Sequence, residues 1–314
     1  MGDRGPGAGP VEDPVVLVTG ATGRQGGAVT KALRRAGHRV RGMTRSPEGA
    51  RATYLASRGV EVVRGDLTDP ASVAAAAKGC AAAFLVTGLD GGPEQEVRAG
   101  LAALEGILAA GRAHTVLASV ASCDRDTGVP HFDSKWRLEE ALRSSGLPFT
   151  VVAPVFFMEN PRPSLAATGG RVLASPLPPD RPLQQVCLED IGQFVRWVVE
   201  HPASSLGRRF EIAGDELTGE RAAEVLGRVT GRPVTYRPLE PDPRMLGADI
   251  AAMFRWLANE GYGVDVPGLH RRVPEVGWHS FEEWARGREW PGDAGPGGPG
   301  GPGGPGGPGG PGGP

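Results

Sequence analysis

Two side chains that can take part in proton transfer stand four positions apart in the middle of the chain. They are His131 and Lys135, in the run His-Phe-Asp-Ser-Lys. Residues at i and i+4 share one face of a helix. A histidine there can donate or accept a proton near neutral pH, and a lysine can hold hydroxyl groups and lower the pKa of a neighbouring acid. The alternative is an exposed lysine on a charged helix. We expect this helix to begin at Asp133, which leaves His131 just before it.

Hydroxyl side chains stand at the ends of two apolar runs. Thr87 follows residues 81–86, and Ser119 lies in the run 115–120. If both runs are strands of one parallel sheet, their carboxyl ends meet at a single crevice, which places Thr87 among the expected cofactor contacts. A proton could then come from His131, or from a water held by Ser119 and Lys135. We therefore take these three residues as the candidate catalytic group.

The crevice needs a ligand, and a glycine-rich turn near the N-terminus indicates one. Four apolar residues, 15–18, read as a buried strand, and glycines follow with the spacing G-x-x-G-x-x-G before a helix-compatible run. The first glycine permits a tight turn, the second lets the backbone approach a pyrophosphate, and the third lets helix and strand pack closely. The free N–H groups of the helix then face the phosphate. The turn residues expected to bind a dinucleotide are Gly20, Thr22, Gly23, Arg24, Gln25 and Gly26.

The end of the second expected strand bears on the choice of dinucleotide. NAD-preferring folds carry Asp or Glu there, which accepts hydrogen bonds from the ribose 2′-hydroxyl. Residues 39–45 instead end in Thr-Arg, without a carboxylate. Arg45 can pair with a 2′-phosphate, and Arg24 can supply a second cation. The alternative is two surface arginines. The missing acid predicts NADP(H) in preference to NAD(H).

A polar residue also follows the third expected strand, residues 60–64. The Asp66 side chain can accept a hydrogen bond from an adenine amino group while Leu67 packs on the ring. Asp66 can equally form a turn or cap the helix that begins near Pro70. The residue types leave both interpretations open.

Strands that alternate with helices of 10–15 residues predict an α/β fold with a Rossmann-type, doubly wound parallel sheet and a smaller α/β C-terminal domain. The expected organisation has four parts, and C-terminal strands are free to return to the Rossmann sheet. The parts are a flexible arm at 1–13, an NADP-binding Rossmann domain at 14–155, a substrate or partner domain at 156–290 and a disordered Gly/Pro tail at 291–314.

The composition excludes several classes of protein. The formal net charge is −2, from 34 basic and 36 acidic residues, which argues against a nucleic-acid partner. No apolar signal core and no run of about 18 apolar residues appears, so we expect a cytoplasmic protein with no membrane association. The three cysteines form no Cys-x-x-Cys pair, which predicts neither a disulfide framework nor a metal site. A buried, inert Cys123 is expected.

Two apolar stretches in the C-terminal half have a structural and a functional interpretation. Residues 153–160 can form the wall of a substrate pocket or the core under the second domain. We place Pro154 and Phe157, from this stretch, among the expected cofactor contacts. Farther on, an i, i+3, i+4, i+7 stripe indicates core or a subunit contact, so a homodimer is possible; it comprises Ile250, Met253, Phe254 and Leu257.

Together these segments resemble the NmrA-like branch of the atypical short-chain dehydrogenase/reductases, and especially its NADPH-sensing members. The matching runs are 18–27, 44–45, 65–67, 131–135, 154–160 and 249–256. The resemblance implies a Rossmann domain with a smaller α/β domain. It also implies NADP(H) held by the glycine loop, Arg45, Asp66 and Lys135.

One departure from the wider superfamily leaves two functions open. Those enzymes use a Tyr-x-x-x-Lys pair, and here His131 stands in the place of the tyrosine. Relatives also often carry arginine where this chain has Ala153. The first hypothesis is an NADPH-dependent reductase of a small carbonyl, enone or quinone-like compound. The alternative is a non-catalytic NADPH or redox sensor that acts through a regulatory protein partner. The apolar segment 153–160 favours the reductase and its small-molecule substrate.

Overall fold

The computed structural model describes residues 14–290, so the expectations for the arm at 1–13 and for the tail at 291–314 lie outside the described residues. Its centre is a seven-stranded sheet in which every neighbouring pair is parallel. Across the sheet the strands are β10 (Arg209–Ile212), β6 (Phe149–Pro154), β5 (His114–Ala118), β4 (Cys80–Leu85), β1 (Val15–Val18), β2 (Arg39–Thr44) and β3 (Glu61–Arg64). The predicted doubly wound Rossmann-type sheet is confirmed.

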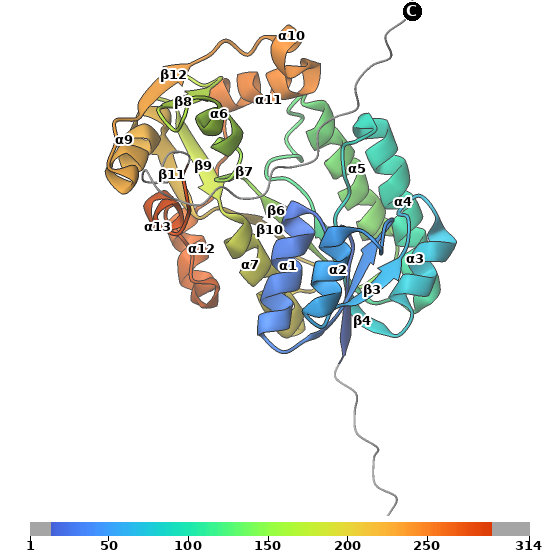
Figure 1. Cartoon of the computed structure of the whole chain (residues 1–314). Coiled ribbons are helices and arrows are strands. Elements are labelled where there is room, and N and C mark those ends of the chain that lie inside the picture. The colour runs from blue at the N-terminus through green and yellow to red at the C-terminus, as the bar shows by residue number, and fades with distance from the viewer. Residues whose placement is uncertain (1–13, 291–314) are drawn as a thin grey trace, which may run out of the picture.

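The strand order reverses between β1 and β4, and the central strands are apolar because helices cover both faces. Helix α1 (Arg24–Arg35) packs against α7 (Leu188–Glu200) on one face, beside α2 (Ala50–Ser57) (Figure 1). On the other face α3 (Pro70–Ala77), α4 (Gly92–Ala110) and α5 (Pro130–Ser144) pack in sequence. The carboxyl ends of the strands therefore share one crevice.

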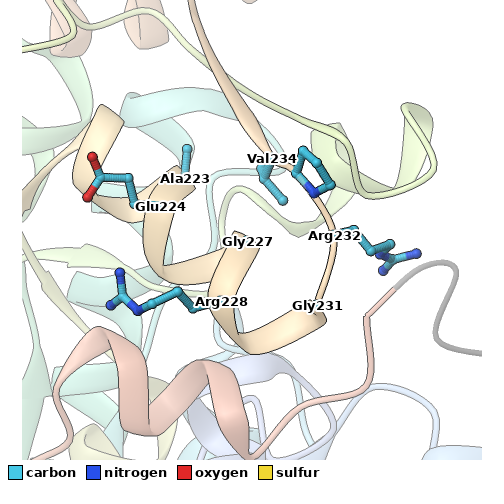
Figure 2. A pocket seen from close by; sticks show the side chains of 8 residues that line it. Ala223, Glu224, Gly227, Arg228, Gly231, Arg232 and Val234 are labelled. Atoms are coloured by element: carbon cyan, nitrogen blue, oxygen red, sulfur yellow. The ribbon is translucent and has the colours of Figure 1, made fainter.

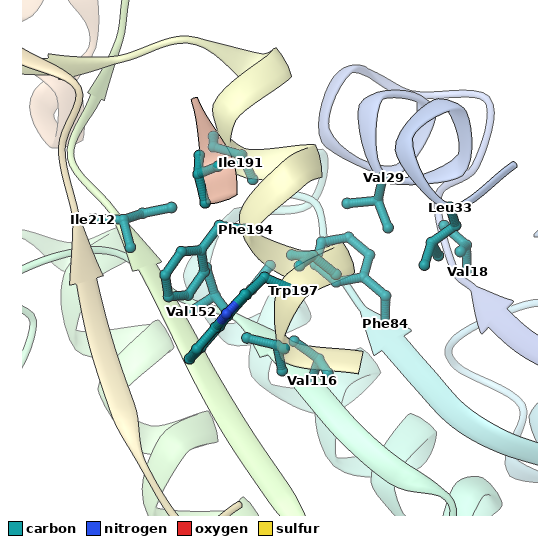
Figure 3. Close-up of a cluster of buried hydrophobic side chains, with 14 of the residues drawn as sticks. Val18, Val29, Leu33, Phe84, Val116, Val152, Ile191, Phe194, Trp197 and Ile212 are labelled. Atoms are coloured by element: carbon teal, nitrogen blue, oxygen red, sulfur yellow. The ribbon is translucent and has the colours of Figure 1, made fainter. Parts of the chain in front are cut away.

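Helix α7 shows that the C-terminal half completes the nucleotide-binding core. Its Phe194 and Trp197 lie against the sheet beside Val116 and Val152, next to the apolar face of α1 (Figure 3). The short α8 (Pro202–Ser205) leads to β10, which pairs with β6 in parallel register. Strand β10 and helix α7 thus belong to the Rossmann layer, although both follow residue 156.

The remaining elements form a smaller group beyond the carboxyl ends of the strands (Figure 1). It has a three-stranded sheet of β7 (Phe156–Phe157), β9 (Pro182–Val186) and β11 (Asp215–Thr218), and a pair formed by β8 (Val172–Ser175) and β12 (Thr235–Pro238). The sequence did not predict β7, β8 or β11, because segments of two to four residues carry too little periodicity.

The helical segments of this group are α6 (Arg162–Ala167), α9 (Gly219–Thr230), α10 (Pro243–Leu246), α11 (Ala248–Asn259), α12 (Val266–Arg272), η1 (Pro274–Val276) and α13 (Phe281–Arg286). Helix α13 begins with the capping box of Ser280 and Glu283. On α11 the stripe residues Met253 and Phe254 are buried against Phe132 of α5 and its neighbours, so the stripe is core. Among the described residues, no helix is both long and apolar enough to cross a membrane.

Candidate cofactor and substrate site

The glycine turn between β1 and α1 has the backbone of a phosphate-binding loop. Gly20 adopts φ +57°, in the left-handed region that favours glycine. A Cβ on Gly26 would lie 2.2 Å from the Gly20 carbonyl oxygen, so the loop closes only around a bare backbone. No side chain caps the N-terminus of α1. Its first-turn N–H groups are therefore available to a phosphate, and the residues present fit a dinucleotide.

The adenosine end of the candidate site lies where β2 and β3 end side by side. Hydrogen bonds from the Thr68 backbone N–H and hydroxyl to Asp66 Oδ1, 2.9 and 2.8 Å long, lower the pKa of Asp66, and the nearby Arg45 charge acts in the same direction. Asp69, rather than Asp66, caps α3. The structure thus gives Asp66 a turn-forming role and also brings it near Arg45; its contact with adenine stays a prediction, as does the packing of Leu67.

Arg24 connects the glycine loop with the C-terminal half. Its Nη1 donates to Asn160 Oδ1 over 3.1 Å, and its guanidinium carbon lies 5.7 Å from the ring centre of Phe157. Phe157 belongs to β7, directly after Pro154 at the end of β6. The sequence proposed Arg24 as a second cation for a 2′-phosphate. The structure shows the side chain engaged with the segment 153–160, and its role as a second cation stays a prediction.

Helix α5 begins at Pro130, three residues earlier than the sequence analysis expected. Proline is well suited to the first helical turn, because its fixed φ matches the helix and its missing N–H would be unsatisfied there. His131 is therefore inside the helix, and Lys135 follows it one turn later on the same face. The predicted start at Asp133 was wrong, and the earlier start places both residues on one face of the helix.

The ring of His131 is oriented by an aspartate of α11. Asp249 Oδ1 accepts from Nδ1 of the ring over 2.7 Å and from the His131 backbone N–H over 3.2 Å. The His131 side chain keeps only 13% of its surface exposed. With Nδ1 engaged, Nε2 is the ring nitrogen left for proton transfer. Asp249 lies 118 positions away, so no local pattern in the sequence indicates this pair.

Lys135 is held by a buried acid that the sequence analysis missed. Its Nζ lies 2.8 Å from Glu96 Oε1 and 2.8 Å from Thr87 Oγ1, and Thr87 donates in turn to Glu96 over 2.8 Å. Ser134 donates to the other Glu96 oxygen. Glu96 is 1% exposed and begins the buried face of α4. The signal in the sequence that could have identified Glu96 is an acidic residue at the start of an apolar helical stripe.

Ser119 belongs to a different group of hydrogen bonds. Its hydroxyl donates to Glu139, which is buried on α5 and also binds Arg209 of β10 over 2.9 Å. The Cys123 thiol reaches the same carboxylate over 3.2 Å, and burial together with the Glu139 charge raises the pKa of this thiol to about 12. The structure joins Lys135 to Thr87 and Glu96 rather than to Ser119, whose catalytic role stays a prediction. Cys123 is buried, as expected.

A pocket of about 180 Å³ lies in the smaller α/β group, against the segment 153–160. Its lining is mostly apolar and includes Phe156, Asn160, Leu183, Tyr236, Phe254 and Phe281. Asn160 is the residue that Arg24 contacts, so the pocket wall and the glycine loop share a hydrogen bond. Segment 153–160 thus forms pocket wall and core at once. A second hollow, of about 530 Å³, lies on α9 (Figure 2). Neither hollow is lined by a residue of the predicted catalytic or cofactor-binding set.

The parallel sheet and its uncapped glycine turn define a dinucleotide-binding protein of the Rossmann type. The chain belongs to the NmrA-like family, whose family model matches residues 12–285, and this is a family of NAD(P)-binding, oxidoreductase-type proteins. A curated relative from Streptomyces griseus, (4-alkanoyl-5-oxo-2,5-dihydrofuran-3-yl)methyl phosphate reductase, is 34% identical over 233 residues, 73% of this chain and 78% of the relative.

Solved structures of two further proteins share the fold. The NADPH-dependent quinone oxidoreductase QOR2 of Escherichia coli, in complex with NADPH, matches with a TM-score of 0.73 at 23% identity, over 86% of this chain and 98% of that one. NmrA, a negative transcriptional regulator solved with NADP and with NAD, matches with a TM-score of 0.71 at 22% identity, over 88% of this chain and 95% of that one. Such neighbours bind either dinucleotide.

Proposed function

We propose that this protein is an NADPH-dependent reductase of a small carbonyl, enone or quinone-like compound. The observation that carries the proposal is the His131–Asp249 pair beside Lys135. A half-buried carboxylate that fixes one ring nitrogen of a histidine, and leaves the other for proton transfer, is the arrangement of a positioned general acid or base. A merely structural histidine would not need a lysine of the candidate cofactor site one turn away.

Different residues of this chain bind different parts of NADPH. The glycine loop and the N-terminus of α1 hold the pyrophosphate, and Arg45 pairs with the 2′-phosphate, which gives the preference for NADP(H). Lys135 donates to the ribose hydroxyls, and Glu96 and Thr87 keep its side chain in place. NADPH, when bound, supplies a hydride to the substrate.

The proton comes from this chain. Nε2 of His131 donates it to the oxygen or carbon that receives negative charge as the substrate is reduced, while Asp249 stabilises the ring through Nδ1. The apolar pocket of about 180 Å³, which is lined by Asn160 but not by His131, supports a small, weakly polar substrate, and the hydrogen bond of Asn160 to Arg24 connects it to the glycine loop. The reductase from Streptomyces griseus and the quinone oxidoreductase from Escherichia coli support the same reaction class.

The test is NADPH oxidation against a panel of quinones, enones and aldehydes. We expect His131→Ala to lower kcat about 100-fold or more with the NADPH dissociation constant unchanged, since it removes only proton transfer. Lys135→Ala should weaken NADPH binding as well. Lys78→Ala, at an exposed lysine beyond α3, is the matched control and should behave like the wild type.

A second candidate is a nucleotide sensor that offers a changed surface to a protein partner. The contact between Arg24 and Asn160 favours it, because NADP(H) in the glycine loop would act on a side chain that reaches the C-terminal half. No turnover with any compound, in a protein that binds NADPH tightly, would replace the reductase by this sensor.

A further inference from the structure

Three side chains of different metal-binding types converge away from the candidate cofactor site. Cys187 caps the N-terminus of α7, Asp190 lies in the first turn of that helix, and His279 precedes α13. The Cys187 Sγ, an Asp190 carboxylate oxygen and a His279 ring nitrogen all lie within 4.8 Å of one another. The spacing of these residues in the sequence does not predict the group, because His279 follows Cys187 by 92 positions.

The distances suit a tetrahedral ion. Cys187 Sγ lies 3.8 Å from His279 Nδ1. Zinc bonds of about 2.3 Å to sulfur and about 2.0 Å to nitrogen place the two ligand atoms roughly 3.6 Å apart in a tetrahedron. His279 Nδ1 lies 2.5 Å from Asp190 Oδ1, a hydrogen bond in which the protonated ring nitrogen donates to the carboxylate. Replacing that proton by an ion requires the ring to swing outward, and its side chain, 35% exposed, faces solvent.

The rest of the group is preorganised. Cys187 and Asp190 are both fully buried. Asp190 Oδ2 accepts from the His279 backbone N–H over 2.9 Å, and the Asp190 backbone N–H points at Cys187 Sγ over 3.5 Å. Gly214, from a third segment, passes close to the carboxylate, since a Cβ there would lie 3.2 Å from Oδ2. Only the ring of His279 has to move.

The choice of ion follows from the types of the three ligands. Two neighbouring carboxylates already have partners: Glu189 lies 3.5 Å from Arg35 Nη1, and Glu159 accepts from the Leu188 backbone N–H over 3.1 Å. The ligand atoms are therefore those of Cys187, Asp190 and His279. Sulfur and imidazole ligands select zinc over magnesium or calcium, which take oxygen ligands.

We propose that Cys187, Asp190 and His279 bind one zinc ion, with a water as the fourth ligand on the exposed side of His279. Binding displaces the thiol proton of Cys187 and the Nδ1 proton of His279 into solvent. The ion joins the start of α7, which packs on the glycine-loop helix α1, to the segment that leads into α13. The site does not depend on the reductase proposal.

The experiment is a titration of the metal-free full chain with Co²⁺, followed by displacement with Zn²⁺. One equivalent of Co²⁺ should produce a thiolate-to-cobalt charge-transfer band and the intense visible absorption of a tetrahedral ion, and Zn²⁺ should abolish both. Cys187→Ser should lose the charge-transfer band. Cys80→Ser and Cys123→Ser, at the other two free cysteines, are the controls and should keep it.

His279→Gln gives a second measurement that keeps the Cys187 thiol in the chain. It should weaken Zn²⁺ binding at least about 100-fold by calorimetry, with the circular dichroism spectrum unchanged, because it removes one of three protein ligands. A folded wild type without the charge-transfer band would overturn the site. So would a band that persists in Cys187→Ser, or equal Zn²⁺ affinity in His279→Gln.

Discussion

At the scale of single residues, the candidate chemistry depends on which atom of each side chain is already engaged. Asp249 occupies Nδ1 of His131, and Glu96 and Thr87 occupy Nζ of Lys135. An oriented imidazole and a fixed ammonium lose little conformational freedom when substrate and cofactor bind, which favours catalysis over loose binding. The hydrogen-bond partners of His131 and Lys135 therefore determine how well these two side chains are positioned for proton transfer and cofactor binding.

Asp249→Asn tests the orientation of His131. The amide cannot stabilise a charged ring and can favour the wrong tautomer, so kcat should fall about 10- to 100-fold with NADPH affinity unchanged. Steady-state kinetics and fluorescence titration measure the two effects. Asp242→Asn, at the N-cap of α10, is the control. Equal activity of the two variants would contradict the positioning role of Asp249.

Arg45→Ala tests the choice of cofactor. Loss of a charge-assisted contact with the 2′-phosphate should weaken NADPH binding about 10- to 100-fold and leave NADH binding unchanged. Dissociation constants for both cofactors, with Arg58→Ala as an exposed control, measure the difference. Equal losses for NADPH and NADH would refute the pairing with a 2′-phosphate.

At the scale of elements, the β1–α1 turn is the most constrained part of the candidate site. Its geometry follows from three glycines that the chain cannot exchange freely, since Gly20 is left-handed and Gly26 packs on the Gly20 carbonyl. The helix that carries His131 is constrained differently. It begins at Pro130, and Asp249 of α11 holds its first turn from outside.

Gly26→Ala and Gly27→Ala form a matched pair for the turn. A Cβ on Gly26 would meet backbone at 2.2 Å, whereas one on Gly27 would make an ordinary contact of 3.4 Å with the Ala21 carbonyl oxygen. We expect Gly26→Ala to abolish NADPH binding and to lower the free energy of unfolding by about 1–3 kcal/mol. Gly27→Ala should fold with equal or greater stability, because alanine favours the helix.

Thermal denaturation and NADPH titration of both variants compare the two positions. If Gly26→Ala binds NADPH as tightly as Gly27→Ala does, the close approach of α1 to the turn is not what the cofactor requires. The phosphate-binding interpretation of the loop would then fail.

At the scale of the whole molecule, the two halves of the chain share one core. Strand β10 extends the Rossmann sheet, α7 covers its face, and Arg209 of β10 binds the buried Glu139 of α5. A domain boundary at residue 155 therefore divides the sequence but does not divide the hydrophobic core, because β10 and α7 follow it. Unfolding should be cooperative across both halves.

A buried histidine makes the stability of this core depend on pH. His114 of β5 lies against the Thr150 hydroxyl at 2.9 Å, and burial lowers its pKa. In the unfolded chain His114 therefore binds a proton at about pH 6.5, and in the folded chain only at lower pH. The free energy of unfolding therefore falls as the pH falls below about 6.5. His114→Gln should lose less stability than the wild type between pH 7.5 and pH 5, as measured by urea unfolding.

His38→Gln, at a histidine on the surface beside Glu200, is the control for this pH dependence. The opposite contribution of His279, whose pKa is raised, is common to all these proteins and cancels in the comparison. Equal loss of stability at acid pH in His114→Gln and the wild type would show that burial of His114 does not carry the effect.

The sequence by itself determined the glycine turn, the order of the main strands and helices, and the family. These features depend on neighbours within about 30 residues, where apolar periodicity and glycine spacing act directly on the local backbone. It also indicated Lys135, His131 and Arg45 by position. The sequence did not predict the short strands or the start of α5, because the limits of these elements depend on the segments that pack against them.

Only the tertiary structure decided the partners. Glu96 reaches Lys135, Asp249 reaches His131, and Asp190 reaches His279 across stretches that the chain folds together. The spacing of the cysteines predicted no metal site, yet Cys187 meets its neighbours through the packing of α7 against the segment before α13. Buried polar groups need partners, and burial is a property of the folded chain, so spacing in sequence cannot assign them.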